Sequence, residues 1–148
     1  MSNTRLLFEE LNIGDAEVSL GRTITETDVV NFAGLSADFN AMHIDAEFAK
    51  KTIFGARVAH GMCTTSIATG LWFTMPRLAT MAFLGLDEWK FVKPVLFGDT
   101  IKVKRVVAEK KETKEDRGIV TFNIQVVNQK DEVVQEGKWL MLVQRRKG

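Results

Sequence analysis

Residues 61–75 read GMCTTSIATGLWFTM, and the architecture of the chain depends on this stretch. It contains no charged residue, and a helix without a charged face is buried on all sides in a globular protein. Small residues recur through it and would let other backbone segments approach closely, while Pro76 helps to end it. We therefore expect a long buried helix from Gly61 to about Met75, around which the remaining chain is packed.

The chain that follows this helix has the period-two alternation of β-strands. Residues 119–127 place apolar side chains on one face and polar ones on the other, which is typical of a half-buried antiparallel strand. Three more strands are expected over 83–93, 100–107 and 132–144. The alternation breaks at Arg105, which predicts a bulge, and the charged segment 110–118 is expected to be a loop. The fold class is thus α+β, with a curved antiparallel sheet wrapped around one long buried helix.

The segment before the buried helix is expected to begin with a helix of its own. Thr25 and Asp28 have the spacing of a capping box, so this helix should start there. Its apolar face is expected to contain Val29, Val30, Phe32, Ala33 and Leu35. Residues 38–45 follow neither helical nor strand periodicity and are expected to form a loop. Asp45 should then cap a short helix.

Length and charge limit the classes of function. With 148 residues the chain is expected to form a single domain over 1–148, and a net charge of +1 gives no electrostatic reason to expect a nucleic-acid partner. Cys63 is the sole cysteine, which excludes an intrachain disulfide and fits a reducing compartment. Neither a signal peptide nor a membrane span is evident, so we expect a soluble, cytoplasmic protein with no membrane partner.

The expected sheet also has a consequence for assembly. A sheet curled around one helix leaves an open edge, and open edges are usually covered by a second subunit. We therefore expect a homodimer or a dimer-based higher oligomer.

Both histidines of the chain lie within residues 38–62, where polar groups interrupt the apolar patterns. Asp38 and His43 are five residues apart in an expected loop and can converge on one point, where a carboxylate and an imidazole can hold a water molecule for proton transfer. The alternative is structural: Asp38 caps a turn, and His43 is a half-buried histidine with its hydrogen bonds satisfied. The spacing alone favours this structural alternative.

His60 and Gly61 open the expected buried helix. The Gly61 N–H would be an unpaired first-turn donor at the positive end of the helix dipole, which suits an oxygen that gains negative charge. Alternatively, Gly61 only eases the turn into the helix and His60 makes a structural hydrogen bond, and the sequence leaves both readings open. Ser66 is expected to bond back to its own helix and Cys63 to pack in the core. Two histidines and one cysteine at these spacings make a poor ligand set, so no metal is expected.

Taken together, these motifs resemble those of the MaoC-like dehydratase family, whose best-known members are R-specific enoyl-CoA hydratases. The resemblance rests on FAGLSADFNAMHID (residues 32–45), AHGM (59–62) and FVKPVLFGDT (91–100), and it spans the chain from about Phe8 to Val143. It implies a hot dog fold, in which a curved antiparallel sheet wraps a long helix, and a dimer with active sites near the interface. It also implies reversible addition of water to a trans-2-enoyl-CoA thioester, for which no metal or redox cofactor is required.

By position, the resemblance assigns Asp38 and His43 to the catalytic pair that holds the water, and Gly61 to the backbone donor for the thioester oxygen. Asn40 would organise the loop, and Ser66 would support the site through a hydrogen bond. The candidate substrate-binding residues are Arg57, His60 and Met62, and the candidates for the phosphates of coenzyme A are Arg57, Lys50, Lys51 and Lys93.

The chain departs from the family pattern at two positions. Ala41 stands where proline is usual, and Ala37 stands where glycine is common. Loss of the proline removes a fixed φ, which is expected to loosen the loop.

Two other functions compete with the hydratase. A hot dog acyl-CoA thioesterase would use a carboxylate to activate water against the thioester carbonyl. A non-catalytic acyl-binding subunit of a heteromeric dehydratase would not need both Asp38 and His43, so the presence of the pair disfavours it. Turnover of crotonyl-CoA would separate the three functions.

Overall fold

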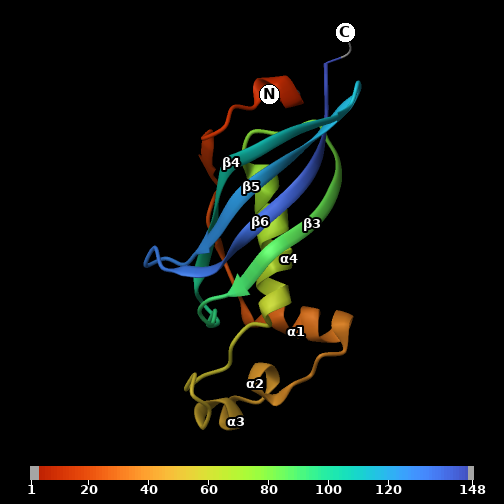
Figure 1. Cartoon of the computed structure of the whole chain (residues 1–148). Helices are drawn as coiled ribbons and strands as arrows, with labels where there is room; N and C mark the ends of the chain where they lie inside the picture. The colour runs from red at the N-terminus through yellow and green to blue at the C-terminus, as the bar shows by residue number, and fades with distance from the viewer. Residues whose placement is uncertain (1–3, 147–148) are drawn as a thin grey trace.

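The computed structural model describes residues 4–146, and a six-stranded antiparallel sheet is its largest part. The four long strands are β3 (Thr80–Phe91), β4 (Thr100–Lys114), β5 (Arg117–Val127) and β6 (Val133–Gln144). Two short strands, β1 (Ala16–Val18) and β2 (Arg22–Thr23), pair with β4, and the main sheet order is β1-β4-β5-β6-β3. Figure 1 shows the sheet curving around helix α4 (Gly61–Leu71). The expected α+β architecture is confirmed.

Helix α4 occupies the centre of the fold, but it is shorter and less enclosed than expected. It ends at Leu71, and a 3₁₀ turn over Trp72–Thr74 leads the chain to Pro76. The exposed residues of this segment include Met62, Ser66, Gly70 and Phe73. They recur every three or four positions, so they form one exposed stripe along the helix. The expectation of a helix buried on all sides is wrong for this stripe, because no other element of the described chain covers it.

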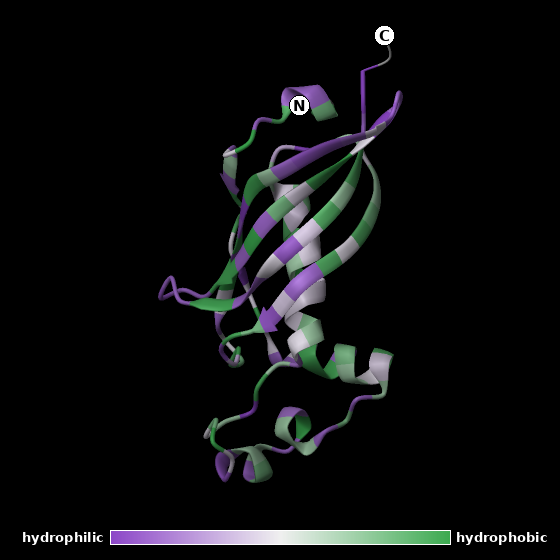
Figure 2. Cartoon of the chain, viewed as in Figure 1, coloured by the Kyte–Doolittle hydropathy of each residue, from purple (hydrophilic) through white to green (hydrophobic). Residues whose placement is uncertain are grey.

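The hydrophobic core lies between α4 and the sheet. Trp72, just after α4, packs edge-to-face on Phe122 of β5 with the ring centroids 4.9 Å apart, and Trp139 of β6 lies 5.8 Å from Trp72. Burying one such side chain stabilises the fold by about 1.5–3 kcal/mol. Figure 2 shows the alternating hydropathy of the strands and the pale, weakly polar colour of much of α4. Within residues 4–146, no helix has the length and hydropathy needed to span a lipid bilayer.

Helix α1 (Glu26–Ser36) starts where the capping box predicted. Thr25 Oγ1 accepts a hydrogen bond from Asp28 N at 3.2 Å, and the Asp28 carboxylate accepts one from Thr25 N at 2.9 Å. The buried face of α1 is narrower than expected, since only Val29 and Ala33 are buried. The expected core residues that are exposed instead are Val30 and Leu35. A helix that lies at the end of the sheet needs only a narrow apolar stripe.

The charged segment 110–118 is a strand hairpin, so the expectation of a loop is wrong. Strand β4 continues to Lys114 and β5 begins at Arg117, which leaves two residues for the turn. The end of β4 extends beyond the core and is exposed on both faces, which removes the alternation on which the prediction relied. The bulge is also displaced, because the pairing of β4 with β5 shifts register between Val107 and Glu109.

Arg105 keeps the alternation of β4 by pointing into the core. The residue is 3% exposed, its guanidinium lies 4.4 Å from the centre of the Trp72 ring, and Nη2 donates to the Pro76 carbonyl at 2.7 Å. Its Nη1 is buried without a partner among the described residues. Burial lowers the pKa of Arg105 to about 10. This pKa lies below that of an arginine in the unfolded chain, so the folded state disfavours the charged guanidinium. The resulting loss of stability is present in full at neutral pH and becomes smaller as the pH rises above about 10.

Two substitutions distinguish the effect of the Arg105 charge on stability from the effect of its carbon stem. Arg105→Met keeps a linear apolar stem over Trp72 and removes the buried charge, so it should raise the free energy of unfolding by about 1 kcal/mol. Arg105→Ala also removes the stem and should lower it by about 3 kcal/mol. Denaturant unfolding at neutral pH measures both changes. If the Met variant were as unstable as the Ala variant, the guanidinium itself would be the stabilising group.

Candidate active site

A cavity of about 500 Å³ is lined by residues from the segment before α4, the start of α4 and the end of β3. Asp38, His43, His60 and Gly61 border it, together with apolar side chains such as Phe91. Ligand sites of this size are typically apolar with a few convergent polar groups. These four candidate site residues, and Met62 with them, therefore meet at one cavity.

The segment 38–45, expected to be a loop, contains a short helix, α2 (Ala41–Ile44). Asn40 caps it, because its side-chain oxygen accepts from Met42 N at 3.3 Å. Ala41 is therefore the first helical residue, a position at which proline is favoured. Four helical residues are too few to show a helical period in the sequence, which is why the prediction of a loop failed. Asp45 then caps α3 (Ala46–Lys50) as expected, through a hydrogen bond from Phe48 N at 2.9 Å.

Asp38 lies just beyond the end of α1 and is held there by a turn. Ala37 ends the helix in the left-handed conformation (φ 61°), which glycine adopts without steric cost. The Asp38 N–H donates to Ser36 Oγ at 3.1 Å, and Asp38 Oδ1 accepts from Asn40 N at 3.2 Å. Asp38 is exposed, and it borders the cavity. Its position at a turn agrees with the structural alternative, while its second carboxylate oxygen leaves it available to a ligand.

His43 is buried, and one hydrogen bond sets its tautomer. Its Nδ1 lies 2.6 Å from the carbonyl oxygen of Val58. A carbonyl can only accept, so Nδ1 carries the proton, and in the neutral ring Nε2 keeps its lone pair. Only one of the two ring nitrogens is thus satisfied by the described part of the protein, and the other can accept a proton.

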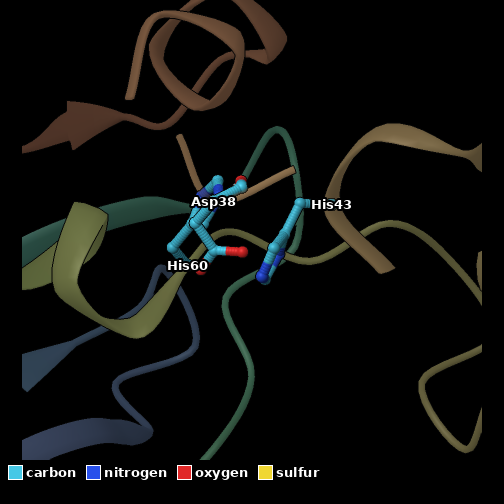
Figure 3. A group of neighbouring side chains, drawn as sticks. All are labelled: Asp38, His43 and His60. Atoms are coloured by element: carbon cyan, nitrogen blue, oxygen red, sulfur yellow. The ribbon is translucent and has the colours of Figure 1, made fainter. Parts of the chain in front are cut away.

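His60 is buried beside His43 and makes the structural hydrogen bond that was one of the two alternatives. Its Nε2 donates to the backbone carbonyl of Asp38 at 2.9 Å. The rings of His43 and His60 are stacked, with centroids 3.7 Å apart and planes inclined by 27°. Figure 3 shows the side chains of Asp38, His43 and His60 gathered together beside the start of α4.

Gly61 is the first residue of α4, and among the described residues nothing accepts a hydrogen bond from its N–H. The ring of Phe91 lies against it, so that a Cβ at position 61 would be 2.7 Å from the nearest ring carbon. A side chain at position 61 would therefore displace either the Phe91 ring or the start of α4. The free N–H lies at the positive end of the α4 dipole, beside the cavity.

Gln135 of β6 is a buried site residue that the sequence reasoning missed. Its Nε2 donates to the Gly61 carbonyl at 2.8 Å, and its Oε1 accepts from Thr65 Oγ1 at 2.7 Å. Trp89 Nε1 donates to the same hydroxyl at 3.2 Å, so the polar groups of this network are paired with one another. The network ties the first turn of α4 to the sheet. The position of Gln135 directly after Val133 and Val134 was the available signal.

The other candidate residues are more dispersed. Met62 borders the cavity, but Ser66 does not, and its hydroxyl donates to the Met62 carbonyl within α4 at 2.7 Å. Arg57 is paired with Glu26 at 2.7 Å and also lies outside the cavity lining. Of the four basic candidates for phosphate contacts (Arg57, Lys50, Lys51 and Lys93), only Lys93 borders the cavity in the part of the chain that is described.

Asp38, His43 and His60 could also be considered as metal ligands, because each offers an atom within 4.8 Å of the others. Two imidazoles that ligate one ion must aim their lone pairs at a common point. The stacked rings of His43 and His60 are nearly parallel and would have to rotate to do so.

Cys63 lies outside the cavity lining, and burial raises its pKa to about 11, which keeps it a neutral thiol at physiological pH.

Comparison with known sequences gives a consistent set of relatives. A model of the MaoC-like domain matches residues 12–129. The chain is 34% identical to 3-hydroxybutyryl-CoA dehydratase of Methylorubrum extorquens over 95% of its length and 86% of that protein. It is 37% identical to (R)-specific enoyl-CoA hydratase of Rhodospirillum rubrum over 70% of its length and 74% of that protein. It is also 41% identical to Protein MaoC of Klebsiella aerogenes, but there it spans only 33% of the relative.

Solved structures agree with the sequence relatives. A protein from an Archaeoglobus species, described as a monoamine oxidase regulatory protein, superimposes with a TM-score of 0.89 at 39% identity, covering 96% of each chain. A Mycobacterium tuberculosis protein described as having a double hot dog fold superimposes with a TM-score of 0.85 at 14% identity, covering 96% of this chain and 45% of that one. The architecture is therefore the expected hot dog fold. With the family model matching most of its length, the chain belongs to the MaoC-like dehydratase family.

Proposed function

We propose that this protein catalyses the reversible addition of water to a trans-2-enoyl-CoA thioester, giving the R-3-hydroxyacyl thioester. In this reaction His43 Nε2 takes a proton from a water molecule that the Asp38 carboxylate also holds. The hydroxyl adds to C3, and the electron pair of the double bond moves toward the thioester oxygen. That oxygen accepts a hydrogen bond from Gly61 N–H, and the proton taken from the water is returned to C2.

One observation carries this proposal: the Nε2 of His43, which has no hydrogen-bond partner among the described residues, the Asp38 carboxylate and the unpaired Gly61 N–H all border one cavity. Hydration develops negative charge on the thioester oxygen, so a fixed donor there binds the transition state more strongly than the substrate. The names of the Methylorubrum and Rhodospirillum relatives, a dehydratase and a hydratase of CoA thioesters, support the same chemistry.

The substrate is proposed to be a coenzyme A thioester, with Lys93 as the basic residue that borders the cavity. Lys93 is also paired with Glu132 on the surface. Such an exposed pair contributes only about 0–1 kcal/mol, so a phosphate group can compete for the lysine at little cost. Arg57 is engaged by Glu26 and by the ring of Phe97, and it is not assigned to the phosphates.

Incubation with crotonyl-CoA tests the proposed function. Loss of the enoyl absorbance without release of free thiol is the expected result, and chromatography on a chiral phase should identify the product as the R-3-hydroxy thioester. Release of free thiol without hydration would indicate the thioesterase instead. Absence of turnover with enoyl-CoA substrates of all tested chain lengths would contradict catalysis and favour the acyl-binding subunit.

The protein is further proposed to act as a homodimer. Strand β3 is an edge of the sheet, and the large apolar side chains exposed along it include Met81, Phe83, Leu84 and Leu86. An exposed apolar edge strand favours association with another chain. The double hot dog fold of the Mycobacterium protein supports the pairing of two such units.

Leu84→Glu and Leu86→Glu should therefore convert the dimer to a monomer, because each places a charge in the proposed apolar interface. Val18→Glu is the matched control, since Val18 is a comparably exposed apolar residue on β1 at the opposite edge of the sheet, and this variant should remain a dimer. Size-exclusion chromatography with light scattering measures the mass. A monomeric wild-type protein would contradict the assignment of the interface.

A further inference from the structure

The side chain of His60 connects the two segments that carry the proposed chemistry. Its Nε2 donates to the Asp38 carbonyl at 2.9 Å, and its ring is stacked on that of His43 with centroids 3.7 Å apart. One peptide bond further along the chain is the free N–H of Gly61. A single residue thus contacts both members of the proposed catalytic pair and is covalently joined to the proposed oxyanion donor.

The packing around His60 restricts its ring to this position. Phe32 of α1 contacts the ring, with centroids 4.9 Å apart and planes inclined by 55°. The residue is only 3% exposed, so the ring cannot turn without displacing its neighbours. His60 therefore holds the end of α1, helix α2 and the start of α4 in a fixed relation.

Histidine is an unfavourable choice at this position if only stability matters. His60 precedes the first residue of α4, yet its side chain makes no capping hydrogen bond to that helix. Since Nε2 donates to a carbonyl, Nδ1 of the neutral ring is an acceptor, and it is buried without a partner among the described residues. An unpaired buried acceptor costs about 1–3 kcal/mol. Residues that break local stability rules in this way concentrate at functional sites.

We propose that His60 is a positioning residue that keeps the water held by Asp38 and His43 aligned with the Gly61 N–H. This inference rests on the proposed hydration reaction and adds a role for a ring whose Nε2 is already bonded to the Asp38 carbonyl. The hydrogen bond to the Asp38 carbonyl fixes where the Asp38 turn lies, and the stack fixes the plane of the His43 ring. Misplacement of a reacting group by about 1 Å can lower a rate by about 100-fold.

Two variants separate the hydrogen bond from the stack. His60→Phe keeps a ring between His43 and Phe32 but removes the donor to the Asp38 carbonyl. It also removes the unpaired acceptor, so the variant should remain folded, with a melting temperature close to that of wild type. Its kcat for crotonyl-CoA hydration should fall by about 100-fold, while KM changes by less than about threefold. His60→Gln keeps an N–H donor of similar reach and should recover about tenfold of that loss.

A double-mutant cycle with Asp38→Asn shows whether His60 acts through Asp38. Because a positioning residue has no effect of its own, His60→Phe should add less than about threefold to the loss caused by Asp38→Asn. Fully additive losses, or a His60→Phe variant with wild-type kcat, would overturn the proposal. Val143→Ala is a control for the general effect of changing a buried side chain, since Val143 lies in β6 outside the cavity lining. This variant should be less stable than wild type and have an unchanged kcat.

Nitrogen-15 spectra of the wild-type imidazoles test the contact without any substrate. His60 should be protonated on Nε2 and His43 on Nδ1, as their carbonyl partners require. A His60 ring protonated only on Nδ1 would lack the bond to Asp38 and would overturn the proposal, whatever the activity. If the expected tautomers were found in a protein that hydrates no enoyl-CoA of any tested chain length, the proposed function would be refuted and the geometry of the contact would remain intact.

Discussion

Asp38→Asn should lower kcat/KM for the hydration of crotonyl-CoA by about 1,000-fold while the protein remains folded. The asparagine amide has nearly the same shape as the carboxylate, and its oxygen can still accept the hydrogen bond from Asn40 N that forms the turn. It carries no negative charge, however, and it presents an N–H₂ group where the water requires an acceptor. The variant therefore removes the proposed chemistry and keeps the local structure.

His43→Gln should cause a loss of similar size for a different reason. Glutamine can replace the donor to the Val58 carbonyl, but it has no nitrogen lone pair with which to take a proton. Since both groups act on one water molecule, the Asp38→Asn/His43→Gln double variant should be at most about tenfold slower than either single variant. Stopped-flow measurement of the enoyl absorbance gives these rates, and circular dichroism on heating verifies the fold.

Asp45→Asn provides the matched control for Asp38→Asn. Asp45 is an exposed acid of the same segment, and it caps α3 through the hydrogen bond from Phe48 N. Asparagine caps helices about as well as aspartate, so this variant should keep both its stability and its activity.

Activity within about threefold of wild type in either Asp38→Asn or His43→Gln would contradict the assignment of the pair.

The fold was predictable where one pattern ran for many residues. The absence of charge over 61–75 indicated the central helix, and the alternation over 119–127 indicated a core strand. The sequence pattern could not reveal the exposed stripe of α4, because small and uncharged residues occur both in cores and on surfaces. Arg105 also misled the prediction, since a long stem with a polar end can replace an apolar residue where Trp72 offers a ring surface.

The candidate site was predictable in its residues but not in its connections. Spacing could indicate that Asp38 and His43 converge, because they are close in the chain. It could not show that His60 bonds to the Asp38 carbonyl, 22 residues earlier, or that Gln135 reaches Gly61 from 74 residues away. Contacts of such separation depend on how the sheet closes over α4, and no local propensity determines them.

Gly61→Ala should lower kcat for hydration by about 100-fold, which is the loss expected when an oxyanion donor is displaced. The added Cβ would lie 2.7 Å from a ring carbon of Phe91, so either the ring or the start of α4 must move. Gln135 ties the Gly61 carbonyl to the sheet and limits how far the helix can shift. We expect the clash to be absorbed partly by the exposed Phe91 ring and partly by a tilt of the peptide that carries the free N–H.

Relief of the clash should restore the rate. In the Gly61→Ala/Phe91→Ala double variant the helix start can return to its place, so kcat should recover by about tenfold relative to Gly61→Ala. Gly34→Ala is the matched control, because Gly34 lies in α1 with open space where the added methyl group would lie, and this change should stabilise the helix by up to about 1 kcal/mol without affecting kcat. If Gly61→Ala retained full kcat, the N–H that donates to the thioester oxygen would have to belong to another residue. If the double variant were no faster than Gly61→Ala, the loss would arise from the methyl group itself, which would lie inside the cavity. A structure with a bound transition-state analogue would then decide the role of the Gly61 N–H. That role would stand only if the oxygen of the analogue contacted this N–H.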